Sequence, residues 1–373
     1  MPNAPRTCLA ALLKAYREPL AVEEVPLPQE IEPGAMLVKN DASSICGSDM
    51  HAWENPPPAS MGIAVALPVV PGHEMMGRIA DLGTVRHDSL GRPLKEGDRI
   101  IWSPGVCGRC FWCTVARRPS LCPNRRYFGV SSVRDYPHVT GAFAEYTYVF
   151  PGCGLVKVPD AVKDHWASAA SCALRSVVHA FERLGTLREP EIVAVQGAGP
   201  IGLFSVAMAA RSGAAQVIAI GAPADRLEVA RKWGADYTIS IDVPHPQRVE
   251  QVKELTGGLG ADVVIEGSGA STAFIEGVEL VRRGGRYLVI GQVGPGSVNF
   301  LPANVVGKEL DIIGSLSGNV SDYYKALCFL DNNRERFDFD AMFPNRYKLR
   351  DIHCAFVAMH ELRDIKPVIT YGT

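Results

Sequence analysis

The sequence predicts an α/β protein in which a β-rich first half is followed by a doubly wound parallel sheet of six strands. Its 373 residues suffice for two to three domains at about 150 residues each. Residues 1–175 are rich in Pro, Gly and short β-type runs, whereas from Glu191 onward strand-like runs alternate with helical stretches. Because alternating strands and helices form parallel sheets, the two halves are expected to be separate domains.

The first of these domains, residues 1–175, carries four clear β-type runs. They are AMLVKN, GRIADLG, DRIIWSP and FAEYTYVF, which begin at residues 35, 77, 98 and 143. Short strands separated by long loops favour an antiparallel, barrel-like domain.

The second domain, residues 176–316, is predicted from its alternation. Its six expected strands are EIVAVQ, QVIAIG, YTISI, ADVVIEGSG, GRYLVIG and LDIIGS. The helix before the fifth strand is expected to end at Arg283. The remaining residues, 317–373, match neither pattern clearly.

Composition excludes several classes of function. The chain has 38 Lys+Arg and 40 Asp+Glu, and this net charge of -2 gives no reason to expect a nucleic-acid or membrane partner. The apolar runs at 63–70 and 201–210 are well short of the roughly 18 residues that span a bilayer. The first residues do not resemble a secretory signal, so a cytoplasmic location is expected.

A glycine-rich turn follows the strand EIVAVQ and precedes an apolar-periodic helix. It consists of GAGPIG, with Gly197, Gly199, Pro200, Ile201 and Gly202. Glycines permit a tight turn and close backbone approach, and the free N–H groups of a helix start attract a pyrophosphate. Pro200 fits the first helical turn. The turn predicts a dinucleotide site, and the alternative is an ordinary strand-to-helix turn.

The choice between NAD and NADP stays open. The next strand would end in an acidic residue that binds the NAD ribose, but here it ends in Gly221. Asp225 is expected instead to form a capping box with Glu228. Arg226 is either a partner for a 2′-phosphate or a surface arginine.

Two sets of cysteine and histidine residues predict zinc. Cys107, Cys110, Cys113 and Cys122 are spaced three, three and nine residues apart and can fill all four positions of a structural ion, in a lobe at about 104–125. Four unrelated free cysteines are the alternative, and a reducing compartment favours metal over disulfides.

The second set is Cys46, His73 and Cys172. Three ligands with an open fourth position are the pattern of a catalytic zinc. Spacing alone is weak evidence, because a lone Cys is often a small buried hydrophobe and a lone His a core residue.

The chain resembles a known family at this point, the zinc-dependent medium-chain alcohol and polyol dehydrogenases. The similarity covers nearly the whole chain and is carried by CGSD with His51, GHE at 72 with Gly77, Gly83 and GD at 97, the four-cysteine lobe, GAFAEY at 141, GAGPIG and IKPVITYG. It implies a GroES-like catalytic domain interrupted by a Rossmann domain, with 317–373 returning to the catalytic half. It also implies that Cys46, His73 and Cys172 hold the catalytic zinc, with Glu74 beside them as a neighbour or alternate ligand.

The resemblance assigns further residues near the expected zinc. Asp49 matches the residue that orients the ligating His73, and its alternative is a turn-forming Asp. Lys366 matches a basic residue that approaches the cofactor pyrophosphate or Glu74, and its alternative is a surface lysine.

Other matches concern proton transfer and substrate contact. Ser48 and His51 match a proton relay that ends at solvent through the cofactor ribose, and their alternatives are a turn hydroxyl and an exposed histidine. Ser176, four residues after Cys172 on the same expected helical face, matches a nicotinamide contact. Trp53 and Trp102 are expected to line the substrate pocket unless they belong to the core.

Three features depart from the family pattern. Some relatives carry Glu in place of Cys172, the acid is missing at Gly221, and the spacing from Cys113 to Cys122 is one residue longer than expected.

The implied reaction is hydride transfer between an alcohol and NAD(P), with the zinc acting as a Lewis acid. The apolar, proline-rich loop 55–68 favours a bulky or apolar alcohol, and Arg175 is a weaker candidate contact for an anionic substrate group. The alternatives are an aldehyde-acting dehydrogenase or dismutase of the same superfamily, and a non-catalytic NADPH-binding protein, which the intact ligands disfavour. The resemblance also implies a homodimer or homotetramer, because the strand region near Lys308 to Ser315 lies at the sheet edge where relatives pair.

Overall fold

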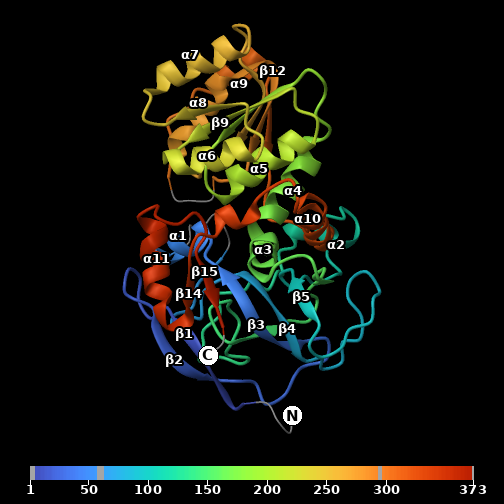
Figure 1. Ribbon diagram of the computed structural model, residues 1–373. Coiled ribbons are helices and arrows are strands. Elements are labelled where there is room, and N and C mark those ends of the chain that lie inside the picture. Colours follow the sequence, from blue (N-terminus) through green and yellow to red (C-terminus); the bar gives the residue numbers. More distant parts are fainter. Residues whose placement is uncertain (1–4, 57–62, 293–295, 372–373) are drawn as a thin grey trace. The chain divides into compact units, whose positions relative to one another are not determined.

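The computed structural model describes residues 5–56, 63–292 and 296–371 (Figure 1). Contacts divide the chain into two compact units. The first unit contains Met1–Arg175, Gly318–Asn333 and Phe343–Thr373, and the second contains Ser176–Ser317 and Arg334–Met342. The expectation that all of 317–373 completes the first unit is therefore wrong for Arg334–Met342.

The first unit is built on a seven-stranded sheet in the order β14-β15-β3-β4-β5-β7, with β6 also paired to β3. All of its pairs are antiparallel except β14 with β15. A separate two-stranded sheet joins β1 and β2. The strands are β1 (Thr7–Leu12), β2 (Ala21–Pro26), β3 (Met36–Ser44), β4 (Glu74–Asp81), β5 (Arg99–Trp102), β6 (Tyr146–Val149), β7 (Leu155–Lys157), β14 (Arg346–Lys348) and β15 (Val368–Thr370).

Strand β3 is the centre of this unit. It pairs with β4, β6 and β15, and most of its side chains are buried, because both faces of the strand are covered by the core. Its C-terminal end leads directly into the segment that contains Cys46. The antiparallel first half predicted from the sequence is confirmed.

Short helices surround the sheet of the first unit. They are α1 (Gly47–Glu54), α2 (Phe111–Thr114), α3 (Asp164–Ala169), α10 (Val320–Asn333) and α11 (Ile352–His360), with 3-10 turns at Pro119–Leu121 and Leu349–Asp351. Helix α3 continues through a π-helical turn, Ala170–Leu174, into α4 (Arg175–Leu184). π-Helical turns are rare and concentrate at functional sites.

The second unit contains a parallel sheet of six strands in the order β10-β9-β8-β11-β12-β13. The sequence order of the strands reverses between β8 and β11, as in a doubly wound dinucleotide-binding sheet. The strands are β8 (Ile192–Gln196), β9 (Gln216–Gly221), β10 (Tyr237–Ser240), β11 (Ala261–Glu266), β12 (Val281–Val289) and β13 (Asp311–Gly314). The six predicted strands are confirmed, and β13 lies at an edge of the sheet.

The helices of this unit connect its strands. They are α5 (Pro200–Arg211), α6 (Ala224–Lys232), α7 (His245–Leu255), α8 (Ser271–Leu280) and α9 (Ala303–Lys308). Helix α8 ends at Leu280, three residues before the expected Arg283, because β12 already begins at Val281. The capping box expected for α6 is also wrong: Pro223 is the N-cap, so Asp225 lies within the first turn.

Aromatic packing explains why Arg334–Met342 belongs to the second unit. Trp233 is fully buried, and its ring lies 5.4 Å from that of Phe339 and 6.1 Å from that of Phe337. Two large aromatic side chains buried against Trp233 anchor this segment to the second unit. Among the described residues, no helix is both long and apolar enough to cross a bilayer.

Candidate functional site

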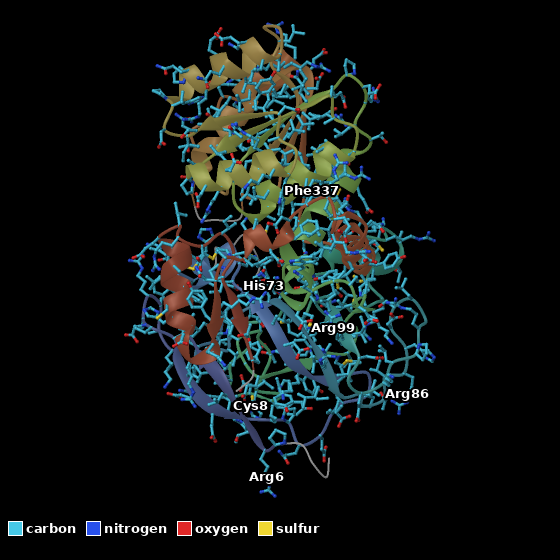
Figure 2. The ribbon with its side chains drawn as sticks, viewed as in Figure 1. Arg6, Cys8, His73, Arg86, Arg99 and Phe337 are labelled. Carbon is cyan, nitrogen blue, oxygen red and sulfur yellow. The ribbon has the colours of Figure 1, made fainter. Side chains whose placement is uncertain are left out.

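Four side chains from separate segments of the first unit meet in one cluster. Cys46 precedes α1, His73 precedes β4, Glu74 begins β4 and Cys172 lies in the π-helical turn. One potential ligand atom from each of the four lies within 4.8 Å of the others. The Sγ atoms of Cys46 and Cys172 are 4.0 Å apart. His73 marks this cluster in Figure 2.

Helix α1 positions two of these groups through Asp49. One carboxylate oxygen of Asp49 accepts the backbone N–H of Cys46 at 2.9 Å and closes the N-terminus of the helix. The other oxygen lies 2.9 Å from Nδ1 of His73. With its proton held on Nδ1, the imidazole presents the lone pair of Nε2, which is the form that ligates a metal.

Cys172 is placed by the π-helical turn and by a neighbouring arginine. The backbone N–H of Arg175 donates to the carbonyl of Ala170, five residues earlier. Its side chain is buried, and Nη2 donates to Sγ of Cys172 at 3.6 Å while Nε donates to the carbonyl of Ser171 at 3.2 Å. The guanidinium of Arg175 therefore donates hydrogen bonds to neighbouring groups of the protein.

The same geometry polarises the cluster. A hydrogen bond from Cys46 holds the pKa of Cys172 well below its usual value, and Arg175 lowers it further. The same bond raises the pKa of Cys46 to about 11. Burial lowers the pKa of His73, but the charges of Asp49 and Cys172 outweigh it and raise that pKa well above its ordinary value. The cluster therefore favours a thiolate on Cys172 beside a positively polarised imidazole on His73. A bound cation can take the place of that positive charge.

Glu74 and Lys366 form a fully buried ion pair beside the cluster. The Lys366 ammonium lies 2.5 Å and 2.6 Å from the two carboxylate oxygens, and the side chains are 1% and 0% exposed. Ser44 donates to Glu74 at 2.6 Å and receives a bond from Ser168 at 3.1 Å. Burial raises the pKa of Glu74 to about 7, and Lys366 restrains the rise. Lys366 is thus not a surface lysine.

Ser48 and His51 lie on α1 close to the cluster in sequence. The hydroxyl of Ser48 donates to Sγ of Cys46 at 3.3 Å and lies 3.4 Å from Nε2 of His73. His51 is exposed, three residues further along the same helix. Residues three apart are neighbours on a helix surface, so the two side chains lead from the cluster toward solvent.

The two tryptophans expected to line a pocket are held by packing. Trp53 donates to the carbonyl of Glu18 at 2.7 Å, and its ring lies 6.3 Å from that of Phe356 in α11. Trp102 is 2% exposed and packs edge-on against Phe128. The structure therefore places both in or against the core of the first unit.

The four-cysteine lobe brings its sulfur atoms together. Their separations are 3.5 Å for Cys110 to Cys113, 3.8 Å for Cys110 to Cys122 and 3.6 Å for Cys107 to Cys122. The backbone N–H of Arg109 lowers the pKa of Cys107 to about 6. The lobe is thus arranged for four donors around one point, with no carboxylate or imidazole among them.

The glycine turn of the second unit has the geometry that its sequence predicts. Gly197 adopts a φ of 108°, which favours glycine, and Gly199 is the N-cap of α5 with Pro200 in the first turn. A Cβ on Gly202 would lie 1.8 Å from the carbonyl oxygen of Gly197. Ile201 follows in the same turn, and the free N–H groups of a helix start are able to bind an anion.

The other residues predicted around the dinucleotide are placed as follows. A Cβ on Gly221 would lie 2.7 Å from Cβ of Ala198, so the turn itself leaves no room for an acidic side chain there. Arg226 is 7% exposed and is not a surface arginine. Ser176 is buried in α4, directly after the π-helical turn that contains Cys172.

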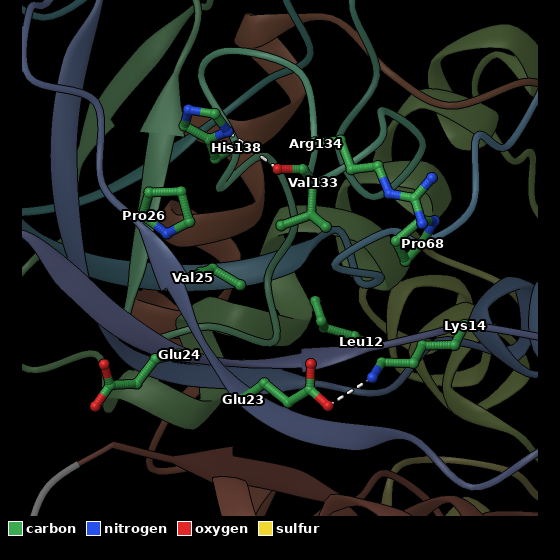
Figure 3. A pocket seen from close by; sticks show the side chains of 10 residues that line it. All are labelled: Leu12, Lys14, Glu23, Glu24, Val25, Pro26, Pro68, Val133, Arg134 and His138. Atoms are coloured by element: carbon green, nitrogen blue, oxygen red, sulfur yellow. Dashed lines mark hydrogen bonds and ion pairs between the residues drawn. The ribbon is translucent and has the colours of Figure 1, made fainter.

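A cavity of about 530 Å³ lies elsewhere in the first unit (Figure 3). Its lining comes from β1, β2 and two loops, and an ion pair between Lys14 and Glu23 borders it. None of the residues predicted for the active site lines this cavity. It is therefore separate from the chemistry of the cysteine cluster.

Comparisons with known proteins agree with this geometry. Residues 32–160 match the family model described as alcohol dehydrogenase GroES-like domain, and 200–332 match the model described as zinc-binding dehydrogenase. The chain is 33% identical to a 5-exo-hydroxycamphor dehydrogenase from Pseudomonas putida, over 93% of this chain and 94% of that one. This chain belongs to the zinc-dependent medium-chain dehydrogenases. The dehydrogenase is also 32% identical to a sorbitol dehydrogenase from Halalkalibacterium halodurans, over 94% of this chain and 95% of that one.

Solved structures show the same fold. An alcohol dehydrogenase from Thermotoga maritima superimposes with a TM-score of 0.89 at 31% identity, covering 98% of this chain and 99% of the other. A benzyl alcohol dehydrogenase from Acinetobacter calcoaceticus gives a TM-score of 0.84 at 24% identity, covering 99% of this chain and 100% of the other. The GroES-like and Rossmann domains predicted for the dehydrogenase are therefore confirmed.

The donor sets of the dehydrogenase fit zinc. Thiolates about 2.3 Å from a tetrahedral zinc lie about 3.8 Å from each other. The separation of 4.0 Å between Cys46 and Cys172 and those of 3.5 to 3.8 Å in the lobe match this value. Two sulfurs and an imidazole leave one corner open in the first set, whereas four sulfurs close the second.

The sequence alone did not indicate the support around Glu74. Ser44 faces Glu74 because the register of β3 and β4 pairs these two residues directly. Ser168 reaches them from α3. The only sequence signal is the polar pair Ser43 and Ser44 at the end of an otherwise apolar strand.

Proposed function

We propose that this zinc-dependent alcohol dehydrogenase carries its catalytic ion on Cys46, His73 and Cys172 and transfers hydride between a bulky, apolar alcohol and NAD(P). The observation that supports the ligand set most directly is the contact between Asp49 and Nδ1 of His73 at 2.9 Å, which leaves Nε2 facing the two sulfurs. A zinc ion held there would lower the pKa of an alcohol hydroxyl or polarise a carbonyl, and a nicotinamide would take or give the hydride.

The side chains around the cluster have separate tasks in this proposal. Two thiolates offset the charge of a divalent cation, and Asp49 keeps His73 in its ligating form. Ser48, within hydrogen-bond distance of the cluster, accepts the alcohol proton, and the exposed His51 exchanges it with solvent. Glu74, held by Lys366 and Ser44, adds a compensated negative charge beside the ligands.

The dinucleotide is proposed to bind at the glycine turn that begins α5. The turn provides backbone N–H groups and the positive end of a helix dipole for the pyrophosphate. Because Gly221 carries no carboxylate and has no space for one, a 2′-phosphate meets no repulsion at this position. Both NAD⁺ and NADP⁺ are therefore used as cofactors in the activity assay described below.

The proposed substrate class is supported by two observations. The described part of the loop 55–68 contains the apolar run Ile63 to Leu67, whose side chains are half-buried or exposed; residues 57–62 lie outside the described structure. A relative with 33% identity is named for 5-exo-hydroxycamphor, a rigid apolar secondary alcohol. Other relatives are named for polyols and for L-threonine, so these compounds are the comparison substrates.

We also propose two zinc ions per chain, a homo-oligomer and a reducing, cytoplasmic location. The four-sulfur lobe supports the second ion, and the exposed edge strand β13 supports pairing between copies. All ten cysteines are free of disulfides, which supports the location.

Metal analysis and a substrate panel test the proposal. The wild-type enzyme is expected to contain about two zinc ions, and Cys46→Ala and Cys113→Ser each to lose a different one. Only Cys46→Ala should abolish oxidation of bornane-type alcohols, measured with NAD⁺ and NADP⁺ against sorbitol and L-threonine. Full activity of Cys46→Ala with its metal intact would reject the ligand assignment, and preference for sorbitol or L-threonine would reject the substrate class.

A further inference from the structure

A buried carboxylate at the end of β11 holds two loops of the second unit together. Glu266 is the last residue of β11 and is 0% exposed. Its Oε1 accepts the backbone N–H of Ser268 at 2.8 Å, the hydroxyl of Ser268 at 2.9 Å and the N–H of Gly269 at 2.7 Å. Its Oε2 accepts the N–H of Gly291, just after β12, at 3.0 Å, and the same N–H also donates to the backbone carbonyl of Glu266 at 3.2 Å. One side chain thus joins the loops that follow two neighbouring strands.

These loops are in contact with the glycine turn. A Cβ on Gly197 would lie 2.8 Å from the backbone nitrogen of Ser268, so the turn and the loop after β11 touch without intervening side chains. A Cβ on Gly291 would lie 2.6 Å from the nitrogen of Gly269. The three backbone segments therefore form one packed layer at the carboxyl edge of the sheet, and the side chain of Glu266 ties two of them, the loops after β11 and β12, to each other.

The position of this layer in the sheet connects it to the cofactor. In doubly wound sheets each half of the strand order serves one mononucleotide, and the dinucleotide crosses the point where the order reverses. That reversal lies between β8 and β11. The glycine turn belongs to the β8 half, and the loops held by Glu266 belong to the β11 half.

We propose that Glu266 is a positioning residue for the nicotinamide half of the dinucleotide, an inference that rests on the proposed function. Glu266 acts through the loops and not by contact with the cofactor. By fixing the loops after β11 and β12 to each other beside the glycine turn, it preforms the surface on which that half binds, so that binding does not have to order them.

The chemistry of the contacts requires a carboxylate. Three donors converge on Oε1 and a fourth reaches Oε2, and bonds to an ionised acceptor are about twice as strong as neutral ones. A glutamine can keep its oxygen toward Ser268 and Gly269, but its NH₂ then faces the N–H of Gly291, and two donors cannot bond to each other. Glu266→Gln therefore removes the side-chain bond to Gly291 with almost no change in volume, and leaves the Gly291 N–H only its weaker bond to the backbone carbonyl of Glu266, at 3.2 Å.

Binding measurements with two probes test the proposal. Titration calorimetry gives the Kd of the wild type and of Glu266→Gln for NADH, for NADPH and for ADP-ribose, which lacks the nicotinamide. We expect Glu266→Gln to raise the Kd of the reduced dinucleotide about tenfold and that of ADP-ribose less than about twofold. The matched control is Glu191→Gln, which alters a carboxylate bonded to Arg286 at 2.6 Å at the opposite end of the same sheet and should leave both values unchanged.

Each outcome separates the inference from the proposed function. An equal loss for both probes, or no loss for either, overturns the positioning role. A wild-type protein that binds neither NADH nor NADPH overturns the proposed function, and the inference with it. If Glu266→Gln does not fold, Ser268→Ala is the second variant. It removes one bond to the same oxygen and the bond that the Ser268 hydroxyl accepts from the N–H of Ala270, and should produce a smaller split, about threefold, in the same direction. Equal effects on both probes overturn the role there too.

Discussion

Removing Lys366 from its buried ion pair is expected to destabilise the first unit strongly. In Lys366→Met the chain keeps a side chain of similar length, but Glu74 loses the ammonium that lies 2.5 Å away. Glu74 is 0% exposed, so water cannot replace the lost partner. Breaking a buried pair by removing one member costs about 3–5 kcal/mol when the remaining charge stays ionised. Without Lys366 the pKa of Glu74, already raised to about 7 by burial, rises further, so the full cost is expected above neutral pH and falls as the carboxyl takes up a proton.

An exposed pair in the same unit provides the matched control. Lys14 and Glu23 are also 2.5 Å apart, but their side chains are 49% and 47% exposed. Lys14→Met should therefore cost under about 1 kcal/mol, although the distance is the same. The comparison isolates burial as the variable.

Urea denaturation followed by tryptophan fluorescence measures the difference. Of the five tryptophans only Trp233 lies in the second unit, so the signal reports mainly on the first. With a slope of about 3 kcal/mol per molar urea, Lys366→Met should lower the midpoint by about 1–2 M. Equal midpoints for Lys366→Met and Lys14→Met would refute the reasoning. The double variant Glu74→Gln/Lys366→Met should regain part of the loss, since it leaves no lone charge.

Three further changes test other parts of the molecule. Asp49→Asn keeps a cap for α1 but removes the charge that holds His73. It should lower the zinc affinity of this site about 10- to 100-fold in chelator competition, while the lobe keeps its ion. Equal zinc retention by variant and wild type would contradict this. Gly202→Ala places a Cβ 1.8 Å from the carbonyl oxygen of Gly197. It should weaken NADH binding at least about tenfold in calorimetry, with the zinc content unchanged. Unaltered affinity would show that the glycine turn is not the binding site for NADH. Ile312→Lys, on the exposed edge strand β13, should shift the mass in light scattering from oligomer to smaller species, and an unchanged mass would exclude this edge.

The second unit could be predicted almost completely because its signals are local. A buried parallel strand is a continuous apolar run, and the glycine turn must follow such a strand and precede a helix. Both properties are visible in EIVAVQGAGPIG. Two errors lie where a neighbour changed the local preference: α8 ends early at Leu280, and α6 begins at Ala224 after Pro223. A third is Arg334–Met342, which a tertiary contact with Trp233 places in this unit.

The first unit could be predicted in its residues and, through the resemblance, in the partners Asp49 and Lys366, but not in the contacts of Ser44 and Ser168. Cys46, His73 and Cys172 carry metal-ligand chemistry in their side chains, so a resemblance sufficed to select them. Their partners depend on tertiary contacts between distant segments. The pair of Glu74 and Lys366 joins residues 292 apart in sequence, and no periodicity relates them.

The π-helical turn at Cys172 shows why position within a helix cannot be read from spacing alone. Apolar residues around Ala170–Leu174 suit an α-helix equally well. In the π-helical turn the backbone N–H of Arg175 donates to the carbonyl of Ala170, five residues earlier, and the side chain of Arg175 donates to Cys172 and to the carbonyl of Ser171. The rare turn and the buried guanidinium are thus one feature: the turn places the arginine within reach of the sulfur, and the positive charge favours the thiolate that a metal requires.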